Sequence, residues 1–521
     1  MSAGKENWGS RIGLILAMAG NAVGLGNFLR FPAQAIQNGG GAFIIPYLVC
    51  FLLMGIPLLY IEWSMGRFGG KFGQHSTPFI LDAMGGKQKM WKYFGVFGIF
   101  TNIAVAAYYC YLESWTLSWA YHSILGDFTT MDQAGVQGFF TSYIGLESIE
   151  PIIFWIICLV LNTYILSRGL SGGVEIAAKV GMPLLIVFGV FLAYKGYSTT
   201  AGVDGAINDG MVGLNFLWTP DFQSIWSPKV WLAAAGQIFF TLSVGMGTIH
   251  CYASYMKENE DVALNSMSAG WMNEFVEVVL GSAIVIPIAV GYLGIDKVKE
   301  LGGFAMGFVT LPYLFAQWGD LLSKMAGFMW FGLLFFAGIT SSLAMGTPMM
   351  GFLKDNFKWT HNKSAIAFGA SVLILGIPCV MSQKGFNEYD YWAGTVSLVV
   401  FALAEIILFA WVFGLQDSYK KWNHPKNTDI LPEAVFLFPA WEEITSGADI
   451  KVPSIFKLII KYVTPIFLLA VFVGSIPDII TNISSETDLW GWISRGTLIA
   501  LFILISYYVK VASINLKTNN L

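Results

Sequence analysis

Two glycine-rich stretches inside long apolar segments carry the first groups in this sequence that could do chemistry. Residues 20–27 read GNAVGLGN, and residues 241–247 read TLSVGMG. Each glycine lowers helix stability by about 1 kcal/mol relative to alanine, so both stretches are expected to interrupt a helix and leave peptide groups unpaired. In hydrocarbon such groups are tolerated only where protein or a water-filled cavity receives them. Unpaired peptide dipoles of this kind can be satisfied by a cation together with a zwitterion.

Ionisable side chains inside apolar segments are the second set of candidates, because a charge within a membrane span is by default a functional hypothesis. Among them are Arg30, Glu62, Glu277, Asp390 and Glu405. Glu62 is expected to brace the second glycine-rich stretch by accepting hydrogen bonds from its amides. Glu405 is expected to be structural. Glu277 lies one helical turn after Asn273, so the two can share one face of a helix.

Motifs of catalysis are missing from the sequence. It contains no HExxH, no GxSxG and no phosphate-binding loop, and its histidines are isolated, which disfavours a membrane enzyme. The five cysteines are scattered without CxxC spacing, so neither a disulfide framework nor a zinc site is implied. A channel would need a repeated pore-lining element, usually assembled by several subunits, whereas this chain alone supplies two complementary half-sites. A sensor without transport stays open.

The composition identifies the solvent in which these groups must be placed. Of 521 residues, 55% are hydrophobic and only 12% are charged, which favours a polytopic membrane protein. A helix needs about 20 apolar residues to cross a bilayer, and by that criterion we count roughly twelve spans. The net charge of −4 is small and spread out, so it indicates no nucleic-acid partner. The expected fold is therefore all-α, with the lipid bilayer as a partner.

The apolar periodicity predicts twelve helices. They cover residues 11–36, 41–70, 89–123, 152–168, 174–195, 228–255, 262–294, 324–355, 362–380, 386–413, 453–477 and 488–511. Loop charge predicts their orientation, because basic loops tend to stay in the cytoplasm. Segments 66–92 and 354–363 carry Lys or Arg, whereas all charged residues of 124–150 are acidic, so this segment is expected outside. The protein is therefore expected in the inner (plasma) membrane of the cell, with both termini in the cytoplasm.

The two glycine-rich stretches occupy matching places, in the first and sixth spans. This is the arrangement expected if two units of five helices form an inverted repeat with a binding site at the membrane midplane. The alternative is close packing of small residues between helices. The predicted domains are a cytoplasmic segment 1–10, a first repeat 11–195, a second repeat with its preceding extracellular loop 196–413, a cytoplasmic connector 414–452, and two further helices with a tail, 453–521.

Several long motifs resemble one known family. The stretch WGSRIGLILAMAGNAVGLGNFLRFPAQAIQNGGGAFIIPYL is followed in order by GIPLLYIEWSMGRFGG, AAYYCYLESW, GLNFLWTPDF, GQIFFTLSVGMG, YASY, FFAGITSS and DYWAGT. This series resembles the neurotransmitter:sodium symporters, most closely their prokaryotic leucine-transporter (LeuT-like) branch. The resemblance implies sodium-coupled symport of a neutral, hydrophobic α-amino acid by alternating access. Another small zwitterion, such as glycine or an osmolyte, is the alternative substrate.

The resemblance implies two sodium sites. The first would use the Ala22 carbonyl, Asn27, Thr241, Asn273 and the substrate carboxylate, so that each solute improves the other's site. The second would use the carbonyls of Gly20, Val23 and Ala337 with the hydroxyls of Thr340 and Ser341. Read alone, the Thr-Ser-Ser run at 340–342 favours hydroxyls bonded to their own helix, and only the partners that the resemblance supplies favour a sodium site instead.

The resemblance also implies a substrate pocket. Its residues would be Ala22, Leu25, Gly26, Val105, Tyr109, Phe240, Thr241, Ser243, Met246, Ser341 and Met345. The amides of Leu25 and Gly26 would meet a carboxylate at the positive end of a half-helix, and Tyr109 would donate to it. Relatives that carry monoamines have an aspartate where this chain has Gly24. Met246 and Met345 are flexible, so the range of substrate sizes could differ from that of the leucine transporter.

The remaining implied residues form gates and an anion site. Arg30 and Asp390 would make the outer gate, and Lys5 and Asp355 the inner one, with Trp8, Ser254 and Tyr255 beside them. Lys5 stands where an arginine is usual, and a lysine cannot form the same two-pronged pair. Glu277 stands where chloride-dependent members have a small polar residue. A glutamate would supply the negative charge itself, so transport is expected to be independent of chloride.

Overall fold

The computed structural model describes residues 8–86, 90–222, 224–414, 440–486 and 488–518. These residues are built of helices and contain no β-strand. Ten helices among them are long and apolar enough to cross a membrane, and the bent pair α1–α2 makes eleven. The predicted all-α polytopic fold is confirmed. Lys5 lies outside the described residues.

The helices follow the predicted spans. Their bounds are α1 (Arg11–Ala22), α2 (Leu25–Gln37), α3 (Gly41–Cys50), α4 (Ile56–Lys71), α6 (Trp91–Phe94), α7 (Val96–Leu125), α9 (Glu150–Ser167), α10 (Glu175–Tyr197), α12 (Pro228–Leu242), α13 (Thr248–Ala253), α14 (Val262–Glu274), α15 (Ser282–Leu293), α19 (Asp320–Phe357), α20 (His361–Met381), α21 (Gln383–Tyr391), α22 (Ser397–Ile407), α24 (Ile455–Leu458), α25 (Thr464–Ser485) and α26 (Leu489–Thr518). Short π-helical turns join α3 to α4, α14 to α15 and α21 to α22.

Shorter helices fill the connections between the spans, where none was predicted. They are α5 (Thr77–Gly85), α8 (Gln133–Ile144), α11 (Gly210–Trp218), α16 (Ile295–Lys299), α17 (Gly303–Ala305), α18 (Leu311–Ala316) and α23 (Ala440–Thr445). The last two spans are also longer than predicted, because α25 continues to Ser485 and α26 to Thr518. Polar residues at their ends, such as Asn482, hid these extra turns from an apolar pattern.

The first interruption lies between α1 and α2, which are bent by 46°. Ser10 starts α1 by accepting a hydrogen bond of 3.0 Å from the Gly13 amide. The helix ends because Val23 (φ −72°, ψ 94°) and Gly24 (φ −121°, ψ −167°) are extended. The predicted break therefore falls in the middle of the first glycine-rich stretch.

The second interruption separates α12 from α13 by the five residues 243–247. Ser243, Gly245 and Gly247 have positive φ values of 53°, 70° and 95°, a conformation that glycine adopts at least cost. A Cβ atom on Gly245 would also lie 2.3 Å from the carbonyl oxygen of Leu398. Both conditions explain why glycines occupy this stretch, and they leave its peptide groups available for other partners.

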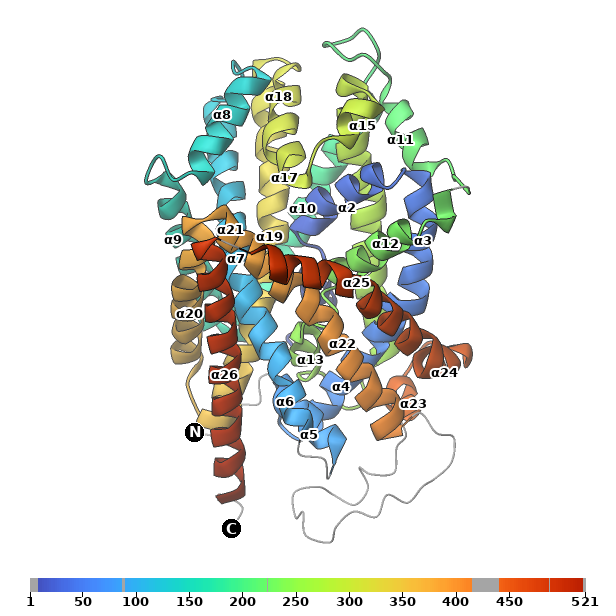
Figure 1. Cartoon of the computed structure of the whole chain (residues 1–521), viewed down its shortest axis with the longest axis vertical. Coiled ribbons are helices and arrows are strands. Elements are labelled where there is room, and N and C mark those ends of the chain that lie inside the picture. Colours follow the sequence, from blue (N-terminus) through green and yellow to red (C-terminus); the bar gives the residue numbers. More distant parts are fainter. Residues whose placement is uncertain (1–7, 87–89, 223, 415–439, 487, 519–521) are drawn as a thin grey trace.

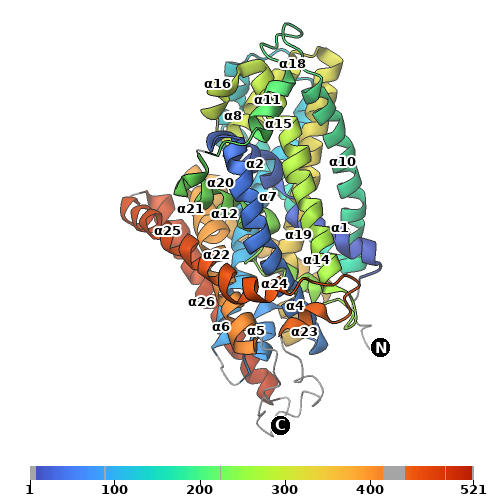
Figure 2. The same ribbon diagram turned by 90° about the vertical axis from the view of Figure 1, so that its right-hand side faces the viewer.

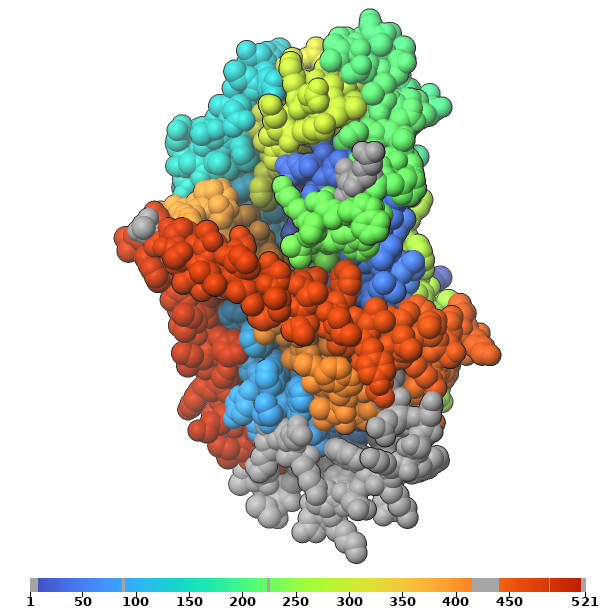
Figure 3. Space-filling model, turned by 45° about the vertical axis from the view of Figure 1, so that its right-hand side comes forward, coloured from blue at the N-terminus to red at the C-terminus, as the bar shows by residue number. Residues whose placement is uncertain are grey.

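The helices stand roughly along the long axis of the molecule, with α7 and α19 packed against each other (Figure 1). Figures 1 and 2 place α8, α11 and α18 at one end, and α5, α23 and the end of α26 at the other. Helix α25 crosses the outside of the bundle as a ridge (Figure 3). The interrupted helices lie inside this bundle, where Val23, Leu242 and Val244 are fully buried.

Candidate functional site

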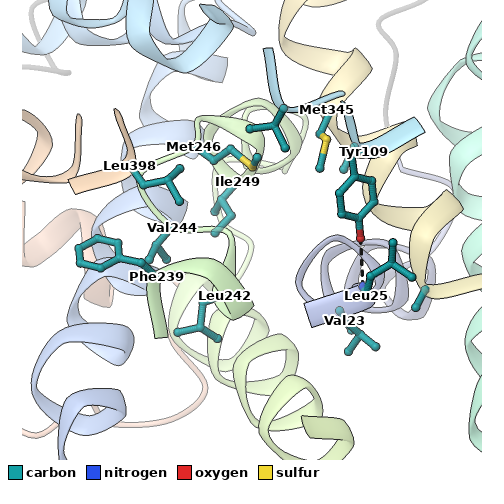
Figure 4. Close-up of a cluster of buried hydrophobic side chains, with 14 of the residues drawn as sticks. Val23, Leu25, Tyr109, Phe239, Leu242, Val244, Met246, Ile249, Met345 and Leu398 are labelled. Carbon is teal, nitrogen blue, oxygen red and sulfur yellow. Dashed lines mark hydrogen bonds between the residues drawn. The ribbon is translucent and has the colours of Figure 1, made fainter. Parts of the chain in front are cut away.

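A cavity lies between the two interruptions. The space free of protein atoms there, including its open mouth, is about 420 Å³. Its lining residues are Asn21, Ala22, Gly24, Gly26, Asn27, Val105, Tyr109, Phe240, Thr241, Ser243, Met246, Ser341, Met345, Gly394 and Leu398. Ten of the eleven predicted substrate residues are in this lining. The eleventh, Leu25, donates its amide hydrogen to the Tyr109 hydroxyl at 3.0 Å. Figure 4 shows this contact, with Met345 beside Tyr109 and with Met246 and Leu398 farther across.

Glycines at the first interruption keep this cavity open. A Cβ atom on Gly24 would lie 2.7 Å from the Tyr109 hydroxyl oxygen, and one on Gly26 would lie 2.5 Å from the Phe240 ring. Real Cβ atoms do not approach other atoms so closely, so any side chain at residue 24 would displace Tyr109. Gly24 therefore holds no carboxylate and leaves room for no other side chain.

Three polar side chains predicted for the first sodium site meet beside the cavity. The Asn27 amide group donates to Asn273 Oδ1 at 2.8 Å and to Thr241 Oγ1 at 3.2 Å, and all three residues are buried. Ala22 lies in the lining of the same cavity. Amide and hydroxyl oxygens are hard ligands of the kind that alkali and alkaline-earth cations take. The donor set therefore fits a small hard cation as cargo.

The residues predicted for the second sodium site join α1 to α19. The Ser341 hydroxyl lies 3.2 Å from the Gly20 carbonyl oxygen and 3.1 Å from that of Ala337. Thr340 bonds to the Ala337 carbonyl at 3.2 Å, and a Cβ atom on Gly20 would lie 2.9 Å from Thr340 Cβ. Both hydroxyls thus bond to their own helix, and the Ser341 hydroxyl also reaches carbonyls at the end of α1. The bonds within α19 are those expected of hydroxyls that bond to their own helix. The approach of Ser341 to Gly20 is compatible with a sodium site between α1 and α19.

Glu277 is surrounded by neutral donors. Tyr47 donates its hydroxyl hydrogen to Oε1 at 2.9 Å, Gln237 donates to the same oxygen at 3.0 Å, and Thr241 donates to Oε2. Glu277 is fully buried and stands in the π-helical turn Phe275–Gly281, one turn after Asn273 as predicted. Three converging donors make an anion site, and this carboxylate fills it.

The predicted outer-gate residues approach the cavity through aromatic rings. The Arg30 guanidinium carbon lies 4.5 Å from the centre of the Phe240 ring. The Asp390 carboxylate accepts a hydrogen bond of 2.7 Å from the Tyr108 hydroxyl. Tyr108 and Tyr109 are neighbours on α7, so the same turn of helix contacts both the gate residue and the pocket.

The predicted inner-gate residues meet at His75, which the sequence did not single out. Its amide donates to Asp355 Oδ2 at 2.8 Å, its Nδ1 lies 2.7 Å from the Ser254 hydroxyl, and its ring stacks on Tyr255 with centres 4.0 Å apart. Trp8 donates its indole hydrogen to the Tyr252 carbonyl at 3.1 Å. This hydrogen bond holds Trp8 against α13, the helix that follows the second interruption.

Two side chains satisfy peptide groups of the second interruption. Glu62 on α4 accepts a hydrogen bond of 2.6 Å from the Gly245 amide, which confirms the bracing role expected from its position. Asn102 on α7 donates to the Met246 carbonyl at 2.6 Å. Asn102 was not predicted, nor were the lining residues Asn21, Gly394 and Leu398. A single polar or small residue in an apolar span gives no signal of its own.

The chain resembles known transporters over most of its length. A model of the sodium:neurotransmitter symporter family matches residues 5–132 and 144–430. An uncharacterized sodium-dependent transporter of Methanocaldococcus jannaschii is 28% identical over 495 residues, which cover 92% of both chains. Sodium-dependent nutrient amino acid transporter 1 of Drosophila mojavensis is 24% identical over 538 residues, covering 91% of this chain and 77% of the relative. The crystal structure of MhsT in complex with L-phenylalanine superposes with a TM-score of 0.75 at 26% identity, covering 91% of this chain and 100% of MhsT.

Proposed function

Since the chain belongs to the sodium:neurotransmitter symporter family of sodium-dependent transporters, we propose a substrate class for it. The proposed function is sodium-coupled symport of a neutral, hydrophobic α-amino acid. The observation that carries this proposal is the two-sided cavity between the interruptions. One side presents the Tyr109 hydroxyl and the peptide groups around Gly24, and the other presents Met246 and Leu398, while Met345 lies beside Tyr109. A molecule with one charged end and one apolar end matches these two sides.

The polar side suits a carboxylate. Transfer of an ionised carboxylate into a membrane interior is strongly unfavourable unless donors and positive charge meet it. The Tyr109 oxygen already accepts the Leu25 amide hydrogen, so its own hydroxyl hydrogen is available for the substrate. The start of α2 adds amide groups and the positive end of a helix dipole. Gly24 offers no acid to a lone amine, which favours a substrate that brings its own carboxylate.

The apolar side favours a larger side chain over glycine or an osmolyte. Met246 and Leu398 line it, Val105 and Met345 add further apolar lining to the cavity, and methionine side chains adapt their shape to what they contact. A substrate without an apolar side chain would leave these surfaces facing empty space or water. L-Phenylalanine, which is bound by the structural relative MhsT, is a reasonable first ligand to test.

Two sodium ions are the proposed coupling cargo. The first would bind among Ala22, Asn27, Thr241, Asn273 and the substrate carboxylate, and the second among Gly20, Val23, Ala337, Thr340 and Ser341. The first set joins the two interruptions, and the second joins α1 to α19. A shared ligand makes the binding free energies of sodium and substrate reciprocal, so neither solute would be held well alone.

Transport independent of chloride is proposed from the surroundings of Glu277. Tyr47, Gln237 and Thr241 already direct their hydrogens at its carboxylate. A chloride ion at the same place would meet a negative charge at contact distance in a poorly solvated site, which is strongly unfavourable.

Alternating access would then proceed between two sets of contacts. Arg30, Phe240, Tyr108 and Asp390 would close the outer path, and Trp8, Ser254, Tyr255 and Asp355 the inner one, with Lys5 joining them. The orientation follows from charge: Arg67 and Lys71 lie in the last turns of α4, which leads into α5, and we assign the end of the molecule that carries α5 to the cytoplasm together with both termini and the connector 414–452. The repeats would be 11–195 and 196–413, with 453–521 outside them.

Uptake by reconstituted protein tests the proposal. Vesicles containing the full chain should accumulate labelled L-phenylalanine when the sodium concentration is higher outside. This accumulation should stop when choline replaces sodium. Uptake that is equal in sodium, lithium, potassium and choline would defeat the coupling. Failure of all neutral amino acids to be taken up, with sodium binding intact, would reject the substrate class.

A further inference from the structure

A second group of ionisable residues lies beside the second interruption and outside the cavity lining. His250 on α13 stands between Glu62 on α4 and Glu405 on α22. Its Nδ1 lies 3.5 Å from Glu62 Oε2, and its Nε2 lies 3.4 Å from Glu405 Oε1. Figure 1 shows α4, α13 and α22 as neighbours in the lower half of the bundle. One ligand atom from each residue lies within 4.8 Å of the others.

These three side chains are buried and short of partners. All are 0% exposed. Among the described residues, both ring nitrogens of His250, both Glu405 oxygens and Glu62 Oε2 have no hydrogen-bond partner. Only Glu62 Oε1 is satisfied, by the Gly245 amide. Unpaired buried polar atoms cost free energy, so a proton shared among these three side chains would stabilise the group.

The surrounding helices bring no cation that could neutralise the two carboxylates. Arg67, farther along α4, is directed at Glu443, and Lys71 is paired with the same carboxylate. Toward the interruption, α7 presents Phe97 and Asn102, and α22 packs Phe401 6.1 Å from the His250 ring. The titratable groups that face His250 are therefore Glu62 and Glu405. Two buried negative charges without a counter-charge are strongly unfavourable, so at least one proton must be shared among the three residues.

We propose that Glu62, His250 and Glu405 form an exchangeable proton-binding site linked to the shape of the second interruption. The proton moves between an oxygen or nitrogen of the site and water, with no other bond made or broken. The Gly245 amide stabilises the carboxylate form of Glu62 more than the neutral form. A rearrangement of residues 243–247 that removes this donor makes protonation more favourable. Protonation and the conformation of the interruption are then linked, and the link acts in both directions.

The geometry favours a proton over a metal ion. A zinc ion needs nitrogen and oxygen ligands that converge on one point at about 2.0–2.2 Å. Here the two carboxylates face different nitrogens of one ring at 3.4–3.5 Å and also approach each other, an arrangement that suits the sharing of a proton among the three residues. The same arrangement joins a helix of the first repeat, α4, to two of the second.

Sodium is the probe that tests this inference, and it requires only the sodium dependence of the family. The proposed substrate class could fail without affecting the result. NaCl is added to purified full-length protein in weakly buffered choline chloride. Sodium bound at Thr241 should order the second interruption, and up to about one proton per chain should be released. A pH indicator measures the release. No release from the unmodified protein would overturn the proposal.

Variants assign the proton to these residues. His250→Gln and Glu405→Gln should each reduce the release at least severalfold while sodium binding persists. The matched control is His122→Gln near the end of α7, because His122 also stands between two carboxylates, Asp127 at 2.6 Å and Glu150 at 2.7 Å, away from both interruptions. The control should release the same number of protons as the unmodified protein. Unchanged release from both cluster variants would place the proton elsewhere and reject the inference.

Two further measurements keep the result decisive. Infrared difference spectra of the unmodified protein, with isotopically labelled histidine, should show an imidazole band and a carboxyl band changing together on sodium addition, whether or not the variants fold. Unchanged bands contradict the proposal. Zinc binding that is lost in both variants, without sodium-linked proton release, would reassign the cluster to a metal ion and also overturn it.

Discussion

The Leu25 amide donates a hydrogen bond of 3.0 Å to the Tyr109 hydroxyl oxygen, across the interruption between α1 and α2. This contact fixes the position of the hydroxyl group at the edge of the cavity. It also leaves the hydroxyl hydrogen free to be donated to a ligand. The carboxylate end of the proposed substrate is thereby assigned to one place, between α2 and α7.

Removal of the Tyr109 hydroxyl should weaken substrate binding. A hydrogen bond to a charged group contributes about 1.5–3 kcal/mol, so Tyr109→Phe should raise the dissociation constant for an amino acid roughly 10- to 100-fold at saturating sodium. Equilibrium binding of labelled L-phenylalanine measures this change. Tyr111→Phe is the control, because the Tyr111 hydroxyl is buried on the same helix without a hydrogen-bond partner among the described residues. Equal affinities for the two variants would remove Tyr109 from the site.

A methyl group at residue 24 should close the polar end of the cavity. In Gly24→Ala the new Cβ would lie 2.7 Å from the Tyr109 oxygen, and overpacking of this kind costs about 1–3 kcal/mol. Amino acid affinity should fall roughly tenfold or more. The matched control is Gly236→Ala on α12, where a Cβ atom would meet nothing within 4 Å. Binding by Gly24→Ala that matches the control would show that the carboxylate does not lie there.

Loss of the Thr340 hydroxyl should increase the sodium requirement. Thr340→Ala removes one proposed ligand of the second sodium, so the half-saturating sodium concentration should rise roughly threefold or more, about 0.7 kcal/mol. Sodium titration of uptake measures it. Thr347→Ala serves as control, because Thr347 is buried on the same helix and bonds to the Ala344 carbonyl at 2.7 Å. If both variants need the same sodium concentration as the unmodified protein, Thr340 is not a ligand.

Replacement of Glu277 should create a chloride requirement. The unmodified protein should transport equally when gluconate replaces chloride, since the Glu277 carboxylate already occupies the anion site. In Glu277→Ser the donors Tyr47, Gln237 and Thr241 would remain around an uncharged residue, and uptake should be stimulated severalfold by chloride. Glu274→Gln, one turn away on the same span, should acquire no such requirement. Strong chloride dependence of the unmodified protein would contradict the role given to Glu277.

The two interruptions could be predicted because glycine disrupts helices for a local reason. The break at residues 23 and 24 falls inside the first glycine-rich stretch, and residues 243–247 fall inside the second. Positive φ at Gly245 and Gly247 confirms that the backbone there needs glycine. Long apolar periodicity likewise predicted the spans, since each must cross the same thickness of hydrocarbon.

Contacts between distant segments could not be predicted from isolated residues. His250 was interpreted as an isolated histidine, yet α13 carries it between Glu62 and Glu405. Gly394 and Leu398 reach the cavity only because α21 and α22 fold over it. By contrast, helix α8 had a local signal that was not used, because Asp132 caps it by accepting a hydrogen bond from the Gly135 amide at 2.8 Å.

A binding screen of the common amino acids with and without sodium tests the central claim most directly. Purified protein should bind neutral amino acids with apolar side chains in NaCl, bind them at least tenfold more weakly in choline chloride, and ignore amines that lack a carboxylate. Affinities that are the same in both salts, or a preference for the amine over the amino acid, would contradict the assignment of the cavity to a carboxylate and a sodium ion bound together.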